Sequence, residues 1–368
     1  MSSATKKVIF DYLNLETEKG AYRAALESKD KLNLFYERAK KSLNADSSLE
    51  IAFMDSASRA WNMALYGIKL NKGDRIVTLS SEFGTNLLSL FYRAYQVGAT
   101  VDVIQTDSSG DFDMGLLENS IRKGGEVVAI SHAAGQGSIV NPVKEIGDMA
   151  KRYGALFLVD GCQALGQIPV DVKSIQADAY TATGRKWLRG PRGTGLLFVN
   201  SKSHLKAEQI DLSGADLVFD KESGEVKGVD VRNDARQFEL WERSYAGMLG
   251  LSNAILENQE QDIEVLNSKV RAFANRIRKE IVSNPKLNLV GKPDSISGLS
   301  GFYVNDVSDE ERVRRNFEDA GVEISTFSHW DCPMFFPKNG IKSIFRLSPH
   351  YYTPESSIDV ACRIISEI

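Results

Sequence analysis

The sequence predicts an α/β protein with a mostly parallel sheet and a smaller α+β part near the C-terminus. Short apolar segments alternate with helical patterns between residues 49 and 200, as in strand–helix–strand repeats. Each segment is continuously apolar rather than alternating, which is typical of strands that are buried on both faces. Near the C-terminus, short strand patterns surround a helical one, which indicates the α+β part.

The elements of the sheet follow in order. Residues 1–48 are charged and carry apolar residues at helical spacing, so this segment is predicted to be helical. Helices are also expected through Trp61, Leu65 and Ile68, from about Thr85 to Gln96, and near 143–153. The strands are predicted at 51–54, 75–80, 100–105, 127–132, 155–160, 179–183 and 195–199.

The pattern changes after residue 200. A charged segment up to about residue 236 is predicted to be rich in loops, and a long helix is predicted from about 243 to 283. The helical segment 311–320 is followed by Gly321, and glycine ends helices well because it adopts the left-handed conformation without strain. Further strands are predicted at 287–290, 301–304 and 345–348.

Composition excludes several classes of function. The net charge of −4 lacks the basic excess that nucleic-acid binding needs, and no apolar run is long enough to span a membrane. The first twenty residues contain no apolar segment typical of a secretory signal. Three cysteines and four histidines show no zinc-ligand spacing, so no metal site is expected, and such sparse cysteines fit a reducing cytoplasm.

The residues best suited to chemistry lie between 155 and 199. Asp160 ends an apolar strand, and ligands of open α/β sheets bind beyond the carboxyl ends of strands. Lys186 follows the next strand and is suited to forming a Schiff base, while Arg185 beside it is a candidate anion ligand. The alternatives are a turn-forming or helix-capping aspartate, a solvated surface lysine and a basic turn at 189–195.

Two motifs together carry a resemblance to a known family. Asp-Gly-Cys-Gln (160–163) and Thr-Gly-Arg-Lys (183–186) resemble the pyridoxal-phosphate (PLP) site of class V aminotransferase-fold enzymes. The segments 184–195, 236–242 and 346–353 are similar to the branch of ergothioneine-type C–S lyases and isopenicillin N epimerase-like proteins. The resemblance implies fold type I with a seven-stranded sheet, a large PLP-binding domain at 17–255, and a small domain from 1–16 and 256–368. It also implies a homodimer.

The resemblance implies that four residues contact the ring of the cofactor or its aldehyde. Lys186 would carry the cofactor as a Schiff base and afterwards transfer protons. Asp160 would keep the pyridine nitrogen protonated, so that the ring can take up electrons. Gln163 would hydrogen-bond the phenolic oxygen of the ring, and Phe83 would stack on its face. Phe83 taken alone is equally an ordinary core aromatic.

The resemblance also implies which residues bind the phosphate of the cofactor and which bind the substrate. Ala57 and Ser58 occupy the phosphate-loop positions at the start of a helix, where backbone N–H groups point outwards. Thr183 and Arg185 would add a hydroxyl and a guanidinium. Arg346 matches the position that binds the substrate α-carboxylate, for which a bidentate guanidinium is suited. His329 and Trp330 are further candidates for contact with the substrate.

Several positions depart from the cysteine desulfurases, which are more distant relatives within the superfamily. Phe83 replaces a histidine that acts there as an acid–base group, and Gly135 replaces an asparagine, with Gln136 or Gln163 left to serve the ring oxygen. Glu242 stands where desulfurases place a threonine on the phosphate. Cys332 lies near the offset of the nucleophilic cysteine in some desulfurases, although a buried, idle cysteine is the other interpretation.

These assignments predict an enzyme that acts on a small amino acid. The favoured reaction is β-elimination from an amino acid with a sulfur leaving group on Cβ, giving pyruvate, ammonia and a thiol-type product. The alternatives are an aminotransferase or an amino-acid epimerase, then a cysteine desulfurase. A protein used only for binding is disfavoured, because it would not need Lys186, Asp160 and Arg346 together.

Overall fold

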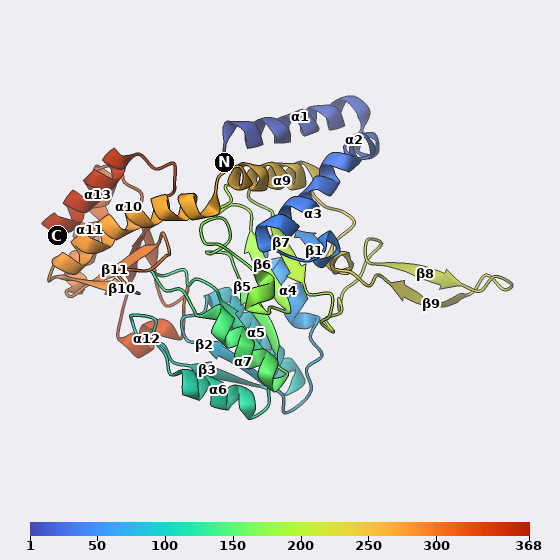
Figure 1. Cartoon of the computed structure of the whole chain (residues 1–368), viewed down its shortest axis with the longest axis horizontal. Helices are drawn as coiled ribbons and strands as arrows, with labels where there is room; N and C mark the ends of the chain where they lie inside the picture. The colour runs from blue at the N-terminus through green and yellow to red at the C-terminus, as the bar shows by residue number, and fades with distance from the viewer. The chain divides into compact units, whose positions relative to one another are not determined.

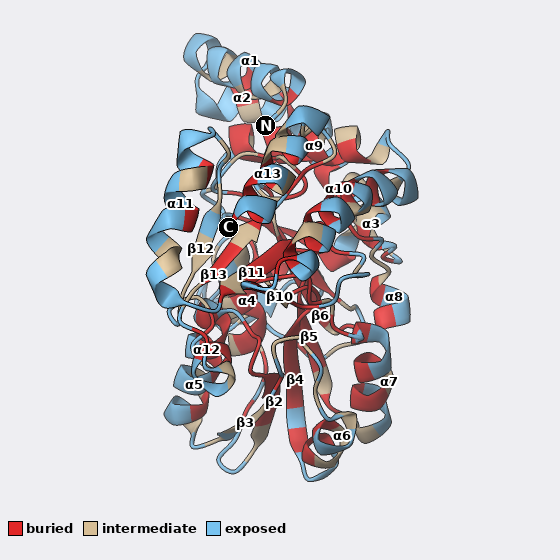
Figure 2. Cartoon of the chain, turned by 90° about the vertical axis from the view of Figure 1, so that its left-hand side faces the viewer, coloured by how far each residue is buried: buried red, intermediate tan, exposed pale blue.

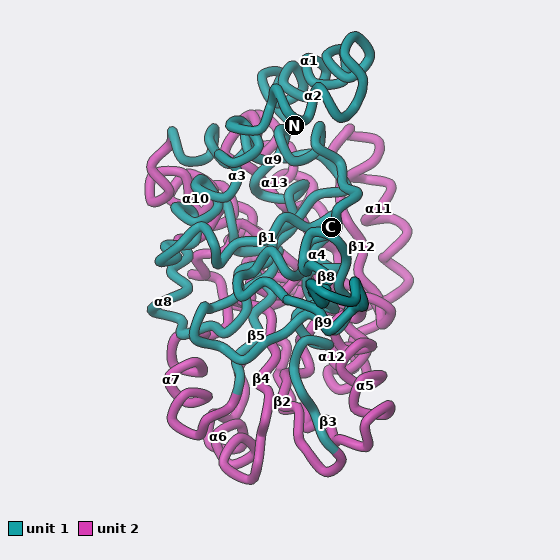
Figure 3. The backbone as a smooth tube through the Cα atoms, turned by 90° about the vertical axis from the view of Figure 1, so that its right-hand side faces the viewer, with its two compact units in different colours: residues 1–71, 156–166, 170–260 teal, residues 72–155, 167–169, 261–368 magenta.

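The computed structural model describes residues 1–368, which form two compact units (Figures 1 and 3). The first unit comprises residues 1–71, 156–166 and 170–260, and the second comprises 72–155, 167–169 and 261–368. The predicted domains, 17–255 and 1–16 with 256–368, stay a prediction, because a compact unit need not fold on its own.

The largest sheet has seven strands in the order β1-β7-β6-β5-β4-β2-β3. Parallel pairing joins β2 to β3, β2 to β4 and β5 to β6, whereas β7 is antiparallel to both β6 and β1. The predicted fold class is therefore confirmed, and each predicted strand matches within two residues at either end. The strands are β1 (Ile51–Met54), β2 (Arg75–Leu79), β3 (Thr100–Ile104), β4 (Gly125–Ser131), β5 (Leu156–Asp160), β6 (Ala179–Thr183) and β7 (Gly195–Val199).

The helices of the first unit include three at the N-terminus, as predicted: α1 (Ser3–Lys19), α2 (Ala21–Glu27) and α3 (Lys29–Leu43). Both α1 and α3 pack on α9 (Tyr245–Gln259). The helix α4 (Ala57–Tyr66) packs on β6 and β7. The shorter helices of this unit are η1 (Ser48–Glu50), α8 (Val172–Ile175) and η2 (Ala235–Phe238).

Two predictions for the middle of the chain are wrong. The helix predicted from 243 to 283 is divided, because α9 ends at Gln259 and a new helix, α10 (Ile263–Ser283), begins after Asp262, whose side chain accepts a hydrogen bond from the Glu264 N–H at 2.9 Å. The segment predicted to be rich in loops contains an antiparallel hairpin of β8 (Ala215–Phe219) and β9 (Val226–Val231). The hairpin extends away from the rest of its unit (Figure 1).

The second unit contains β2, β3 and β4 with the helices α5 (Gly84–Val97), α6 (Met114–Arg122) and α7 (Val143–Tyr153). The strands β2 and β4 are almost entirely buried, which explains their continuous apolar sequence (Figure 2). A second, antiparallel sheet has the order β10-β11-β13-β12. Its strands are β10 (Leu287–Val290), β11 (Ser300–Val304), β12 (Ser325–Phe327) and β13 (Ile344–Leu347).

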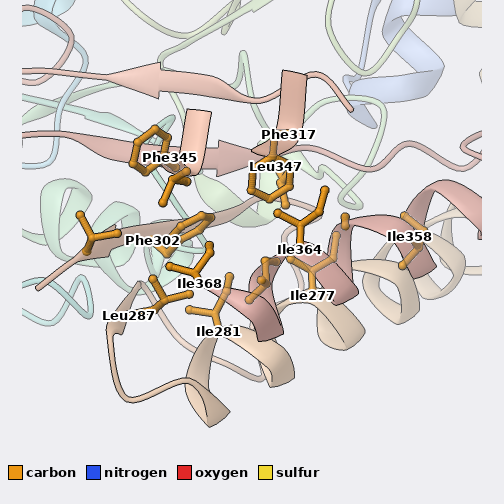
Figure 4. Packing of buried hydrophobic residues seen from close by; sticks show 14 of the residues in the cluster. Ile277, Ile281, Leu287, Phe302, Phe317, Phe345, Leu347, Ile358, Ile364 and Ile368 are labelled. Atoms are coloured by element: carbon orange, nitrogen blue, oxygen red, sulfur yellow. The ribbon is translucent and has the colours of Figure 1, made fainter. Parts of the chain in front are cut away.

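One face of the antiparallel sheet covers a core shared with α10, α11 (Glu310–Asp319) and α13 (Glu355–Glu367) (Figure 4). Phe302 and Phe345 lie side by side in it, with ring centroids 5.6 Å apart. The predicted helix at 311–320 is α11, and Gly321 after it is left-handed, with φ 67°. The sequence did not predict β12 or the short helices η3 (Val307–Asp309) and α12 (Phe335–Asn339). None of the helices is both long and apolar enough to cross a bilayer.

A buried arginine fastens the segment that leads into β11. Arg278 of α10 is fully buried, and burial lowers its pKa to about 10. Its guanidinium donates to the backbone carbonyls of Pro293, Ser295, Ser297 and Leu299 at 2.8–3.1 Å, and to the side chain of Asn275. One side chain therefore satisfies four backbone carbonyls, of which those of Ser297 and Leu299 are buried.

We expect Arg278→Ala to lower the free energy of unfolding by about 2–6 kcal/mol, because the two buried carbonyls, of Ser297 and Leu299, would each lose a donor at a cost of about 1–3 kcal/mol. Urea unfolding followed by circular dichroism measures the change. Arg276→Ala is the matched control on the same helix, since its ion pair with Asp359 is solvent-exposed and contributes little. Equal losses for the two variants would contradict the role of Arg278.

Candidate active site

The residues of the predicted site fall in both units. In the first unit, parallel pairing of β5 with β6 sets Asp160 opposite Thr181. Both strands therefore end at the same edge of the sheet. Asp160 is the last residue of β5, and Lys186 lies three residues after the end of β6. Asp160 is only 7% exposed, and its Oδ1 accepts a hydrogen bond from the Cys162 N–H at 2.8 Å.

Gly161 makes the close turn after Asp160 possible. A Cβ at this position would lie 2.0–2.2 Å from the ring and hydroxyl of Tyr180, so any side chain would collide with β6. The Gly161 N–H donates to the Thr181 carbonyl at 2.7 Å, which holds the turn on the strand. Tyr180, which lies beneath Gly161, is fully buried. Burial is the main cause that raises the pKa of Tyr180, and the Asp160 carboxylate raises it further.

The loop that carries Lys186 is fixed by backbone hydrogen bonds. The Gly184 N–H donates to Thr194 at 2.9 Å, and the Gly190 N–H donates back to Gly184 at 2.7 Å. The Lys186 carbonyl accepts from the Arg189 N–H at 3.0 Å. A Cβ on Gly184 would lie 2.2 Å from the Thr194 hydroxyl oxygen, so the glycine is required for this closure. Lys186 itself stays partly exposed.

Asp160, Lys186 and the end of β6 all influence the thiol of Cys162. Burial raises the pKa of Cys162, and the Asp160 carboxylate raises it further. The charge of Lys186 lowers the same pKa, as does a hydrogen bond with the Thr183 backbone. These groups therefore lie near one thiol, while their roles towards a cofactor stay predictions.

Gln163 lies on the same turn and is 7% exposed. Its Oε1 accepts a hydrogen bond from Nε1 of Trp187, the residue after Lys186, at 3.0 Å. This bond joins the segment after β5 to the segment after β6. Trp187 was not among the predicted site residues, although it lies in the segment 184–195 that carries part of the resemblance. The contact of Gln163 with the ring oxygen stays a prediction.

The N-terminus of α4 lies against β7 and offers donors for an anion. Ser56 caps the helix by accepting from the Arg59 N–H at 3.1 Å, which leaves the N–H groups of Ala57 and Ser58 without a partner inside the helix. A Cβ on Gly195 would lie 3.0 Å from the Ala57 nitrogen, so the glycine lets the helix approach the strand.

Thr183 and Arg185 differ in how closely they approach this helix end. Thr183 pairs with Gly195 in the sheet register, and it is therefore close to the N-terminus of α4. Arg185 is exposed on the loop after β6. The N–H groups at the start of α4 suit an anion, while the roles of Thr183 and Arg185 towards it stay predictions.

In the second unit, Arg346 lies on β13 and is half-buried. Its Nη1 donates to the Gly135 carbonyl at 2.7 Å, and its Nη2 donates to Ser325 Oγ at 3.4 Å. The guanidinium carbon lies 4.5 Å from the centre of the Phe327 ring. These contacts hold the fork in one orientation, which is a condition for bidentate binding of a carboxylate. That binding stays a prediction.

Phe83 is positioned by the glutamate before it. Glu82 is 1% exposed, and its carboxylate accepts hydrogen bonds from the Phe83 N–H, the Asn86 amide and the Ser131 hydroxyl. Phe83 precedes α5 and keeps 38% of its surface exposed, so it is not a core aromatic. Stacking on the cofactor ring remains a prediction for this side chain.

Cys332 is enclosed rather than presented to solvent. It is 0% exposed, and its thiol donates to Gln136 Oε1 at 3.4 Å. Gln136 in turn donates from Nε2 to the Ser81 carbonyl at 3.2 Å, so both ends of this amide contact the protein. Burial raises the pKa of Cys332, and the Glu82 and Asp331 carboxylates raise it further. The interpretation of an idle, buried cysteine fits this environment.

The two predicted substrate contacts lie just before Cys332. His329 and Trp330 are exposed, Trp330 to 81%, and their rings lie 5.0 Å apart. The backbone beneath them is fastened to α5, because the Gly84 N–H donates to the Asp331 carbonyl at 2.6 Å. Their contact with substrate stays a prediction.

Comparison with known proteins identifies the family. The sequence profile of the aminotransferase class-V family matches residues 4–360. The chain belongs to the class-V aminotransferase family. A probable cysteine desulfurase of Methanothermobacter thermautotrophicus is 28% identical over 98% of this chain and 89% of its own length.

Solved structures of other family members share the fold. The apo cysteine desulfurase of Thermococcus onnurineus NA1 superposes with a TM-score of 0.86 at 22% identity, covering 98% of this chain and 91% of that one. C-DES, described as a cystine C–S lyase, superposes with a TM-score of 0.85 at 19% identity, covering 99% and 94%. Another C-DES structure has glycine linked covalently to its PLP cofactor.

PLP is the cofactor of this class-V enzyme. The first unit fits it in three ways. The open N–H groups of Ala57 and Ser58 suit its phosphate. The buried carboxylate of Asp160 suits a protonated ring nitrogen, and the amine of Lys186 suits its aldehyde.

Proposed function

We propose that this class-V enzyme is a PLP-dependent C–S lyase. It would catalyse β-elimination from an amino acid with a sulfur substituent on Cβ, and water would then release pyruvate and ammonia beside the thiol-type product. The observation that carries this proposal is the state of the cysteines, because elimination needs no protein thiolate, whereas desulfuration does.

No cysteine of the chain has the environment of a nucleophile. A reactive cysteine is partly exposed and has a lowered pKa, because the thiolate is the attacking form. Cys332 is fully buried, and burial raises its pKa. Burial also raises the pKa of Cys162, beside the Asp160 carboxylate, and that of Cys362 on α13. Burial therefore disfavours the thiolate at all three cysteines, although Cys162 and Cys362 are partly exposed.

The residues of the chain would divide the elimination among them. Bound PLP supplies an electron sink for the pair left behind when the Cα proton departs. The Lys186 amine would take that proton, and Asp160 would keep the ring nitrogen protonated. Arg346 would hold the substrate carboxylate in its fork, with His329 and Trp330 as further substrate contacts. Phe83 would stack on the ring and Gln163 would donate to its oxygen, while Ala57, Ser58, Thr183 and Arg185 would bind the phosphate.

The main alternative is a cysteine desulfurase, and it is favoured by the names of the relatives. In that reaction a cysteine thiolate attacks the substrate sulfur and keeps it as a persulfide, while alanine leaves. An aminotransferase and an epimerase share the removal of the Cα proton and differ in where a proton returns. The likeness to ergothioneine-type lyases and to epimerases stays part of the proposal, as does a homodimer.

The Cys332→Ala variant separates lyase from desulfurase. We expect it to keep most of the wild-type turnover, with pyruvate as the carbon product, because the thiol is neutral and enclosed. The measurement is a parallel assay of pyruvate and alanine with cysteine, cystine and S-substituted cysteines as substrates. Cys362→Ala, which lies on α13, is the matched control for loss of a half-buried thiol.

A second assay guards against a misfolded variant. Circular dichroism and the absorbance of bound PLP are compared with the wild type, since Cys332 is packed in a core with Phe335 and Phe336. Complete loss of activity in a correctly folded Cys332→Ala, together with a persulfide on Cys332 of the wild type, would overturn the lyase in favour of the desulfurase.

A further inference from the structure

Trp187 connects the two segments that carry the chemistry of the first unit. The residue directly follows Lys186, and it is only 4% exposed. Its indole N–H donates to Gln163 Oε1 at 3.0 Å, across the gap between the segments that follow β5 and β6. A buried indole of this kind needs a hydrogen-bond partner, and here the partner is a residue assigned to the cofactor ring.

The chemistry of the two groups fixes which end of the amide faces which way. A glutamine side chain has one acceptor end and one donor end, and rotation by half a turn exchanges them. An indole N–H can only donate a hydrogen bond. The bond therefore forms only when the oxygen of the Gln163 amide faces Trp187. The NH₂ group of Gln163 is therefore the end that serves its other contacts.

The indole cannot adjust its position to a turned amide. Gly166 packs on the backbone after Lys186, because a Cβ there would lie 2.9 Å from the Trp187 carbonyl carbon and 3.0 Å from the Leu188 nitrogen. Gly166 is itself left-handed, with φ 96°, and its carbonyl accepts a hydrogen bond from the Asn258 side chain at 3.0 Å. The Gln163 turn and the Trp187 backbone are thus held together on both sides.

We propose that Trp187 is a positioning residue that keeps the Gln163 amide turned with its N–H donors towards the phenolic oxygen of PLP. The inference rests on the placing of Gln163 at that oxygen, and it does not depend on the reaction that follows. A donor stabilises the negative charge of the phenolate. An amide free to turn would present its oxygen to the same charge, which is repulsive.

The test is a pH titration of the absorbance of the PLP-loaded, full-length enzyme. Trp187→Phe keeps an aromatic ring in the same space and removes the N–H. We expect the apparent pKa of the bound cofactor to rise by about one unit, because the charged oxygen loses a directed donor. Trp241→Phe is the matched control, since that indole is exposed and packs against Tyr22, and it should leave the titration unchanged.

A double-mutant cycle shows whether the effect passes through Gln163. Gln163→Leu should itself raise the apparent pKa, and adding Trp187→Phe should then change nothing further. An equal shift from Trp187→Phe in both backgrounds would overturn the proposal. If Gln163→Leu leaves the titration unchanged, the placing of Gln163 fails and the proposal with it, while pyruvate formation still decides the proposed lyase separately.

A more conservative replacement covers the case in which Trp187→Phe does not fold. The indole of Trp187 can be replaced with a benzothiophene side chain, which has sulfur in place of the N–H and the same ring shape. The expected rise in the apparent pKa is the same. An unchanged titration in this folded variant would overturn the proposal.

Discussion

Replacing Lys186 with alanine is expected to end the covalent attachment of PLP and to lower turnover by roughly 10²–10⁴-fold, the usual contribution of a positioned acid–base group. The lysine follows β6 on a loop fixed by backbone hydrogen bonds at Gly184 and Gly190, and no other lysine stands between β6 and β7. Under the proposed function, both the aldehyde link and the transfer of the Cα proton would depend on this one amine.

Borohydride reduction followed by peptide mass spectrometry measures the attachment directly. The wild type should carry the label on Lys186, and Lys186→Ala should carry none. Lys202→Ala is the matched control, because this lysine is exposed on the turn after β7 and should leave both label and turnover unchanged. A label on any other lysine of the wild type would show that the site is wrongly assigned.

The sheet could be predicted because burial on both faces leaves a direct mark on sequence. Strands such as β1 and β7 are buried along their whole length, so each of their residues is apolar. The hairpin β8–β9 lacks this mark, because most of its residues are exposed and its turn is charged. Its pairing depends on backbone hydrogen bonds, which any sequence can supply.

The division between α9 and α10 shows a second limit. The residues from Glu260 to Asp262 are polar and compatible with a helix, so periodicity predicts a continuous one. The break appears only in the cap, where the Asp262 side chain bonds to the Glu264 N–H instead of leaving that donor to the helix backbone. Such local competition between side chain and backbone is visible in the structure and weak in the sequence.

The site likewise has features that the sequence predicts by itself and features that depend on tertiary structure. Asp160 and Lys186 could be predicted because each follows a recognisable strand, and parallel strands end together. The closeness of Thr183 to the start of α4 was implied by the resemblance alone, because it depends on the antiparallel register that sets Thr183 opposite Gly195. Burial of Cys332 was one of two interpretations, and it depends on tertiary packing against residues far away in the sequence, such as Gln136.

Asp160→Asn is the second substitution for which we expect a large effect, a loss of turnover of at least ~10²-fold with PLP retained. The asparagine has nearly the same shape, and its amide oxygen can still accept the Cys162 N–H that Asp160 accepts at 2.8 Å. What it lacks is the negative charge. A neutral amide cannot hold a proton on the ring nitrogen of PLP, and without that proton the electron sink is weak.

Steady-state kinetics together with the PLP content of the purified variant separate this effect from loss of cofactor. Asp171→Asn is the matched control, because Asp171 caps α8 through the N–H groups of Lys173 and Ser174, and asparagine caps a helix as well as aspartate does. It should leave turnover unchanged. If Asp160→Asn retains wild-type turnover with a full complement of PLP, the charge of Asp160 is not used in catalysis, and the ring nitrogen must be protonated by another group.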